Sequence, residues 1–207
     1  MMALLISAGT VMAKDLFEKD LSNAHCKQPL WSFSADGVLG STEDQILWTN
    51  AEYENFELTL EFRVTEGGNG GIILYSNNTD NWIPDSIEVQ ISDYEYWLKK
   101  FGDMGTCGAF FGFKGPTENA SKPLNEWNDL KIQAQGKIIK VFINGKLVNE
   151  FDMSKYTDAK KTPDGRDIFK WLQATPRAEL PTKGKIGFQG KHGTGDTNYR
   201  NLKIKSL

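Results

Sequence analysis

The chain has 207 residues, of which 39% are hydrophobic and 25% charged, and its formal net charge is −3. This balance is typical of a globular protein and excludes a disordered or fibrous chain. Lys and Arg are dispersed along the chain rather than gathered into a basic stripe, so we expect no nucleic-acid partner. Aromatic residues reach 12% and glycines number 20, which favours short strands, tight turns and a surface on which a flat ring can stack.

The first 13 residues resemble a secretory signal peptide. Residues 2–13 are apolar and uncharged, and Val11 and Ala13 stand at the small-residue positions that precede a cleavage site. No Lys or Arg precedes the run, so the recorded start is clipped or the true start lies upstream. A strand or helix of the mature fold is the alternative. The segment is shorter than the about 20 apolar residues that span a bilayer, so we expect no membrane span and predict export to the periplasm or the medium, with residues 14–207 as one mature domain.

Alternation with a period of two dominates the chain and predicts strands. Residues 56–64 alternate apolar and polar side chains without a break, and residues 87–93 alternate again. Asn144-Gly145 favours a two-residue hairpin turn between strands at 138–143 and 146–151. Further strands are predicted at 31–33, 38–39, 46–49, 72–76, 129–135, 185–189 and 199–204, and the one candidate helix is at 168–173. Many short strands in antiparallel hairpins predict an all-β, two-sheet antiparallel sandwich.

Residues 153–183 interrupt the series of predicted strands. Three prolines lie there, at positions 163, 176 and 181, among many Lys and Asp residues. Because the strands on both sides fit one sheet system, we expect a long surface loop or lid rather than a linker between domains. Cys26 and Cys107 fit no metal-binding spacing and form either one disulfide, as an exported protein allows, or two separate thiols. We expect no metal and no cofactor.

Polar residues at the strand 87–93 make up the first part of a candidate site. Glu88 and Gln90 share one face, about 6.5 to 7 Å apart, because a strand rises about 3.3 Å per residue. Asp93 follows, and Trp97 supplies a ring on which a sugar can stack. If the strand 56–64 lies in the same sheet, Arg63 projects from the same surface. The same alternation also fits side chains that only face water.

Two glycine-rich segments add further candidates. Asn69 lies in the run 67–71, interpreted as a turn that lets backbone approach a ligand, with a plain hairpin turn as the alternative. His192 follows Gly190-Lys191 on a predicted strand-end loop, where an imidazole can transfer protons near neutral pH. Serine-hydrolase, zincin and nucleotide-hydrolase motifs are absent from the sequence. Gln90 stands where sandwich-fold glucanases carry a central carboxylate, which argues against two-carboxylate glycoside hydrolysis.

An ordered set of motifs carries a resemblance to a known family. The set comprises Asp36-Gly37-Val38-Leu39, Tyr53-Glu54-Asn55-Phe56, Glu61-Phe62-Arg63, Gly68-Asn69-Gly70-Gly71, Glu88-Val89-Gln90-Ile91-Ser92-Asp93, Gly108-Ala109-Phe110-Phe111-Gly112, Glu126-Trp127-Asn128, Ile186-Gly187-Phe188-Gln189 and His192-Gly193. Over residues 15–207 the chain resembles the 3-keto-disaccharide hydrolase domain family. The resemblance implies a concanavalin-like or laminin-G-like jelly roll, usually exported, that acts on glycosides oxidised at C3. It places Arg63, Asn69, Glu88, Gln90, Asp93 and His192 in the polar cluster, although family members often carry Asp directly before the glycine-flanked His.

The chemistry of such a substrate sets the roles that we expect. A C3 ketone acidifies the C2 proton, so one base can remove it, the glycosidic oxygen leaves from C1, and water adds back. We expect Glu88 or Asp93 as the base, His192 in acid–base support, and Arg63 or Lys191 at the enolate oxygen. Trp97 would stack on the sugar. A non-catalytic carbohydrate-binding module and a structural adhesion domain of the same fold are the alternatives, and the oligomeric state is not predicted.

Overall fold

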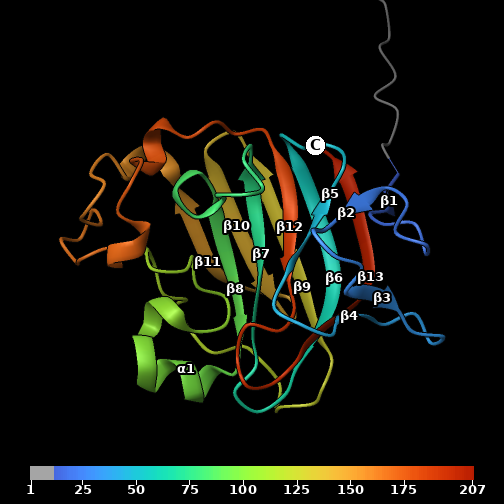
Figure 1. Ribbon diagram of the computed structural model, residues 1–207. Helices are drawn as coiled ribbons and strands as arrows, with labels where there is room; N and C mark the ends of the chain where they lie inside the picture. Colours follow the sequence, from blue (N-terminus) through green and yellow to red (C-terminus); the bar gives the residue numbers. More distant parts are fainter. Residues whose placement is uncertain (1–11) are drawn as a thin grey trace, which may run out of the picture.

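The computed structural model describes residues 12–207 (Figure 1). The predicted signal segment therefore lies outside the described residues, apart from Met12 and Ala13. Within the described range, the structure contains no helix with both the length and the apolar character needed to cross a membrane.

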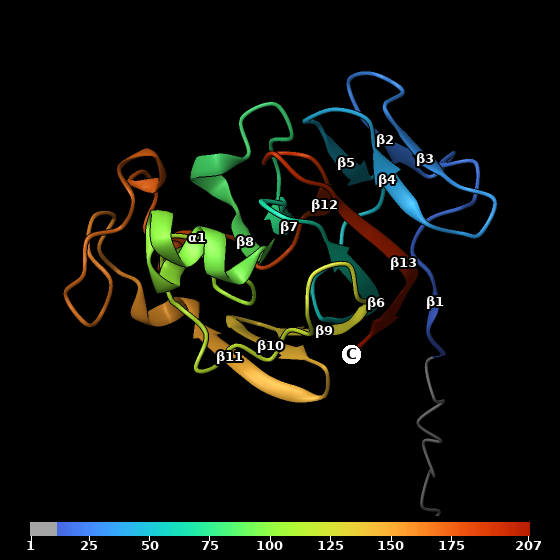
Figure 2. The same ribbon diagram turned by 90° about the horizontal axis from the view of Figure 1, so that it is seen from below.

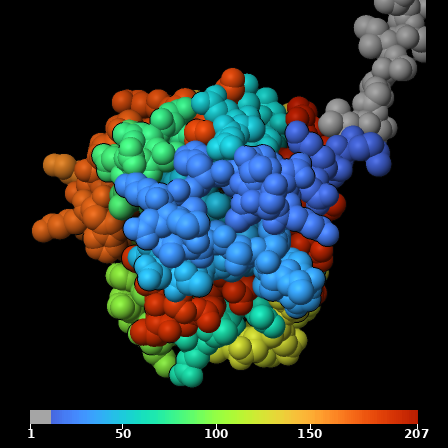
Figure 3. Space-filling view, turned by 45° about the vertical axis from the view of Figure 1, so that its right-hand side comes forward, coloured from blue at the N-terminus to red at the C-terminus, as the bar shows by residue number. Residues whose placement is uncertain are grey.

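Two antiparallel sheets form a sandwich, which confirms the predicted fold class (Figures 1 and 2). The larger sheet has the order β11 (Lys146–Asp152), β10 (Ile138–Ile143), β9 (Asn128–Gln135), β6 (Phe56–Val64), β13 (Thr197–Ser206), β4 (Leu39–Ser41) and β3 (Trp31–Phe33), with β1 (Lys14–Asp15) paired to β13. The smaller sheet has the order β2 (Ala24–His25), β5 (Ile46–Thr49), β12 (Lys185–Gln189), β7 (Asn69–Ser76) and β8 (Ile87–Ser92). Early and late parts of the chain thus lie side by side, as the blue and red atoms of Figure 3 show.

The core lies between the sheets and follows from the period-two pattern. Along β6 the apolar residues at every second position are buried and the polar ones between them are half-buried. Along β8, Ile87, Val89 and Ile91 face the core, which leaves Glu88 and Gln90 on the outer face of the smaller sheet. Burial of these side chains stabilises the fold by about 1.5 to 3 kcal/mol each.

Local predictions differ from the structure around β7 and after β8. An eight-residue helix, α1 (Tyr94–Phe101), follows β8 where no helix was expected. Its signals were present: Asp93 caps the N-terminus, Lys99 and Lys100 lie in the last turn, and Gly102 ends the helix at a φ of 69°. The expected turn at 67–71 is in part the start of β7. Gly70 serves close packing there, because a Cβ on it would lie 2.4 Å from the carbonyl oxygen of Gln189.

The segment 153–183 holds three short 3-10 helices, η3 (Met153–Lys155), η4 (Lys170–Leu172) and η5 (Arg177–Glu179). The helix expected at 168–173 is therefore the single 3-10 turn of η4. The segment lies on the same side of the sandwich as α1 (Figures 1 and 2). Cys26 is partly exposed and Cys107 is buried, and both are free thiols, so of the two alternatives for the cysteines the structure shows separate thiols.

Candidate active site

Glu88 lies on the outer face of the smaller sheet, where its position depends on a glycine in the neighbouring strand. In the β7–β8 register Gln90 pairs with Gly71 and Glu88 with Ile73. A Cβ on Gly71 would lie 2.2 Å from Oε1 of Glu88. The carboxyl group of Glu88 therefore packs directly on the β7 backbone, in space that any other residue at position 71 would fill.

The amides of Gln90 and Asn69 lie beside Glu88. Nε2 of Gln90 donates a hydrogen bond to Oδ1 of Asn69, and the exposed fractions of the two residues are 1% and 4%. Hydrogen bonding between buried amides fixes their orientation, because an unpaired amide would lose its hydration without compensation. The structure thus brings together three of the predicted site residues.

These residues line a cavity of about 300 Å³, here called the sheet-face cavity. Its polar lining residues are Asn69, Glu88, Gln90, Lys100, Gln189 and His192. Its apolar walls are Trp82, Ile83, Trp97, Phe101, Phe111, Trp171 and Leu172. An apolar cavity with a few convergent polar groups is the usual form of a small-molecule site, and aromatic walls suit a sugar ring.

His192 enters this cavity from the loop after β12 and is held by a carboxylate distant in sequence. Its Nδ1 lies 2.6 Å from Oδ2 of Asp44, and its backbone N–H donates to the carbonyl oxygen of Asn69 at 3.0 Å. The hydrogen bond to Asp44 raises the pKa of His192, against a smaller opposing effect of burial. Asp44 thus supplies the carboxylate partner that the residue before His192, Lys191, does not.

Burial raises the pKa of Glu88 to about 8. The charge of His192 lowers this pKa and that of Asp44 raises it, both by less than burial does. A carboxyl group with a pKa near the working pH is a stronger base, once ionised, than an ordinary glutamate. Perturbed groups of this kind in a cleft mark candidate catalytic sites.

Trp97 and Lys100 reach the cavity from one face of α1. Trp97 is only 5% exposed; its Nε1 donates to the carbonyl oxygen of Gly68 at 2.9 Å, and its ring stacks on Phe101 with centroids 5.4 Å apart. Trp97 therefore forms a supporting wall. Trp171, which is 54% exposed, offers a more accessible ring to a sugar. Lys100 holds its Nζ 4.6 Å from the Trp97 ring centroid and is the one Lys or Arg among the described lining residues.

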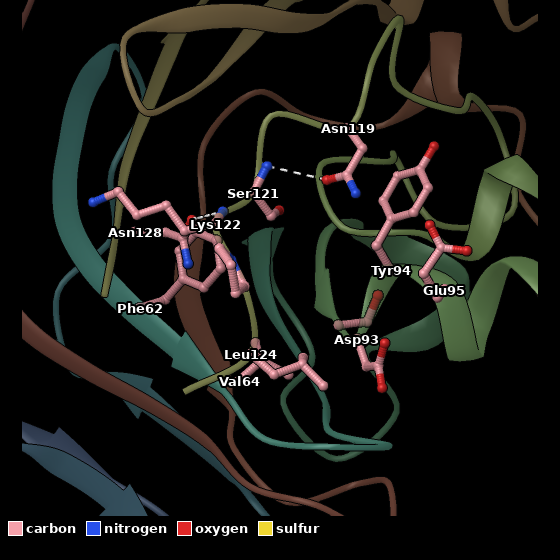
Figure 4. Close-up of a pocket in the computed structure, with 12 residues that line it drawn as sticks. Phe62, Val64, Asp93, Tyr94, Glu95, Asn119, Ser121, Lys122, Leu124 and Asn128 are labelled. Carbon is pink, nitrogen blue, oxygen red and sulfur yellow. Dashed lines mark hydrogen bonds between the residues drawn. The ribbon is translucent and has the colours of Figure 1, made fainter. Parts of the chain in front are cut away.

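Asp93 lies outside the sheet-face cavity, at the start of α1. Its carboxylate accepts hydrogen bonds from the backbone N–H of Gly67 at 3.0 Å and of Tyr96 at 3.3 Å. It borders a separate pocket of about 250 Å³ that includes Tyr94 and Leu124 (Figure 4). Because both carboxylate oxygens are engaged by backbone donors, Asp93 acts as a helix cap, and of the two expected bases only Glu88 lies in the cavity.

The two cations expected at an enolate oxygen are also elsewhere. Arg63 was expected at the site only if its strand lay in the same sheet as Glu88. It belongs to β6 in the larger sheet instead, and its guanidinium lies 4.8 Å from the Trp127 ring centroid. Lys191 forms an ion pair with Asp196 at 2.5 Å and does not line the cavity. Lys100 is the cation that the fold brings to the site.

Sequence reasoning missed Asp44, Lys100, Trp82 and Trp171. Lys100 could have been found by recognising α1, since a helix places residues 97 and 100 on one face. Asp44 and His192 are 148 residues apart, so no local pattern connects them. Trp171 lay in the segment 153–183, whose position over the sheet was not predictable from its composition.

The chain is similar to a known domain family and to proteins of known structure. The model of the 3-keto-alpha-glucoside-1,2-lyase-like domain matches residues 12–205, whereas no curated protein matches the chain. A Parabacteroides distasonis protein of known structure, provisionally named a glycosyl hydrolase, is 46% identical over 95% of this chain and 100% of its own, with a TM-score of 0.89. A second such protein from that organism is 20% identical over 91% and 90%, with a TM-score of 0.71. A carbohydrate-binding module from Bacillus subtilis, 12% identical over 92% and 99% with a TM-score of 0.54, shares the fold alone.

Proposed function

The chain belongs to the 3-keto-alpha-glucoside-1,2-lyase-like domain family, and we propose that it cleaves 3-keto-glycosides by elimination across C1 and C2, followed by hydration. One observation carries the proposal beyond family membership: a single carboxyl group with a raised pKa, Glu88, shares an aromatic cavity with the imidazole of the His192–Asp44 pair. This set supplies one base and one acid, which is what elimination next to a ketone requires.

The reaction begins at C2. The Glu88 carboxylate removes the C2 proton, and the electron pair of the broken C–H bond moves into an enolate on the C3 oxygen. The enolate then forms a C1–C2 double bond and expels the glycosidic oxygen, which takes a proton from the imidazolium of His192. Water adds to C1 of the resulting enone and a proton returns to C2, so the net reaction is hydrolysis.

Lys100 is suited to the enolate oxygen. It lines the cavity, and its ammonium lies over the Trp97 ring. A cation beside an oxygen that gains negative charge stabilises that charge electrostatically. Among the described groups of the cavity, no other Lys or Arg takes this role.

Ordinary glycoside hydrolysis fits the cavity less well. That reaction uses two carboxyl groups on either side of the scissile bond. The described lining residues of the sheet-face cavity include one carboxyl group, Glu88, while Asp44 is hydrogen-bonded to His192. The proposal therefore predicts that an oxidised C3 is required for cleavage.

The test compares a 3-keto-disaccharide with the same disaccharide before oxidation. The wild-type protein should release reducing sugar from the first only. Glu88→Gln should lower kcat/KM at least about 100-fold, the usual contribution of a positioned base. Glu150→Gln, on β11 of the other sheet and half exposed, is the matched control and should retain activity.

The pH profile tests the assignment of the two protons. Reaction needs ionised Glu88, whose pKa burial raises to about 8, and protonated His192, whose pKa the hydrogen bond to Asp44 raises. The dependence of kcat/KM on pH should therefore be bell-shaped, with a fall on the acid side and a fall on the alkaline side. Binding of the 3-keto-disaccharide without release of sugar would overturn the catalytic proposal in favour of a carbohydrate-binding module.

A further inference from the structure

A second cavity of about 330 Å³, here called the β5 cavity, lies beside the sheet-face cavity. Ile46 and Trp48 of β5 line it, together with Thr79 from the segment between β7 and β8. Two features join the cavities. Trp82 lines both, and Asp44, which lines the β5 cavity, is hydrogen-bonded to His192 of the other. The cavities are therefore adjoining parts of one groove over the smaller sheet.

The lining of the β5 cavity suits an uncharged, hydroxylated ring. Trp48 lies flat on the sheet, because a Cβ on Gly187 would be 2.5 Å from its ring, and Trp82 is a partly exposed wall. Carboxylates of Asp44 and Asp80 offer acceptors for hydroxyl groups. Lys27 lies 3.2 Å from Asp80 and is paired with it, so the lining disfavours an anionic group such as a phosphate. The volume falls in the range of small-molecule pockets, about 300 to 1,000 Å³.

The order of the strands indicates how the substrate is oriented relative to the β5 cavity. In the order β5, β12, β7 and β8, the proposed acid His192 is held by Asp44, which lines the β5 cavity, whereas Glu88 belongs to β8 and Lys100 to α1, the helix that follows β8. The sugar presents its groups in a matching order: the leaving oxygen on C1, the acidic proton on C2 and the ketone on C3. With the acid at C1 and the cation at C3, the leaving group must extend from His192 towards β5.

We infer that the β5 cavity is the leaving-group subsite and that it holds a second, uncharged sugar ring against Trp82. This inference rests on the proposed function and adds to it the orientation of the substrate in the groove and the residues that select its leaving group. The oxidised ring lies over β7 and β8, and the unoxidised ring lies over β5.

The test uses two substrates with the same oxidised ring, a 3-keto-disaccharide and the methyl 3-keto-glucoside. Thr79→Trp places an indole in the β5 cavity. It should lower the ratio of kcat/KM for the disaccharide to that for the methyl glycoside at least about tenfold, which corresponds to about 1.4 kcal/mol of lost binding. Thr157→Trp adds the same ring at an exposed position of the segment 153–183 and should leave the ratio as in the wild type.

The substrate preference of the wild type tests the subsite even if Thr79→Trp does not fold. The wild type should prefer the disaccharide to the methyl glycoside about tenfold or more, and should discriminate against a disaccharide phosphorylated on the leaving sugar. Equal kcat/KM for the methyl glycoside and the disaccharide, or an unchanged ratio in folded Thr79→Trp, would overturn the subsite while the proposed function stands. Turnover of neither substrate would instead overturn the proposed function.

Discussion

Among single residues, Glu88 has a buried carboxyl group that lowers the stability of the fold when it is ionised. Its carboxyl group packs against Gly71 and lines a cavity with aromatic walls, and burial raises its pKa to about 8. An ordinary glutamate has a pKa of about 4.3. Between these two values the unfolded chain releases the proton and the folded chain keeps it, so the folded state loses stability as pH rises through this range.

Glu88→Gln should therefore stabilise the protein above pH 8, because the amide is neutral at every pH and removes the cost of a buried charge. We expect a higher Tm for the variant at pH 8.5 by at least about 2 to 4 °C, which corresponds to about 1 kcal/mol in a protein of this size. At pH 5, where Glu88 is protonated in the fold, the two proteins should differ less. Thermal unfolding at both pH values measures the Tm difference between the variant and the wild type. An equal difference at pH 5 and 8.5 would show that the charge of Glu88 does not destabilise the fold.

At the scale of elements, the pairing of β7 with β8 decides where the carboxyl group points. Glu88 is on the outer face because Ile87, Val89 and Ile91 take the core face of an alternating strand. This much was predictable, as was its proximity to Gln90. The role of Gly71 was not, because the contact between its backbone and Glu88 depends on strand register, and the run of glycines looked like a turn.

Gly71→Ala should move the Glu88 carboxyl group, since the new Cβ would lie 2.2 Å from Oε1 in the present geometry. We expect kcat/KM to fall at least about tenfold, because displacement of a catalytic group by about 1 Å can cost 100-fold. Gly40→Ala on β4 is the control: its Cβ meets only the flexible amide end of Asn198 within 4 Å. Steady-state kinetics and a folding check by circular dichroism make the comparison. Full activity in folded Gly71→Ala would show that the packing is not needed.

The helix α1 decides the role of Asp93 and the position of Lys100. Asp93 was expected as a possible base because it follows a candidate catalytic strand, but the fold uses it as a cap whose oxygens accept from two backbone N–H groups. The choice between the two roles depended on whether the chain turned into a helix after residue 93. That turn also brought Lys100 to the cavity in place of the two cations, Arg63 and Lys191, that sequence reasoning preferred.

At the scale of the whole molecule, Arg177 connects two walls of the sheet-face cavity. It is 1% exposed, and its guanidinium donates to the carbonyl oxygens of Pro84, Thr175 and Leu172 and lies 4.4 Å from the Phe113 ring centroid. Pro84 follows the Trp82 wall and Leu172 follows Trp171, so one buried side chain holds together segments about 90 residues apart.

Arg177→Met should lower the free energy of unfolding by about 3 kcal/mol, because it leaves buried carbonyl oxygens without their donor. Arg166→Met is the control. Arg166 is partly exposed and ion-paired with Asp103 and Asp164, so its loss should cost less than about 1 kcal/mol. Urea unfolding of the three proteins gives the values. A similar, small loss in both variants would show that Arg177 does not hold the walls together.

The strands, the two-sheet sandwich and the family membership follow from the amino-acid sequence, because alternation records which side of each strand is buried and the ordered motifs run through most of the chain. For the same reason Glu88, Gln90 and Asn69 could be grouped in advance. Tertiary structure alone decided the partner of His192, the cation of the cavity and the groove that links Trp82 to Trp48. Each of these depends on contacts between elements far apart in the chain, and a local pattern carries no information about them.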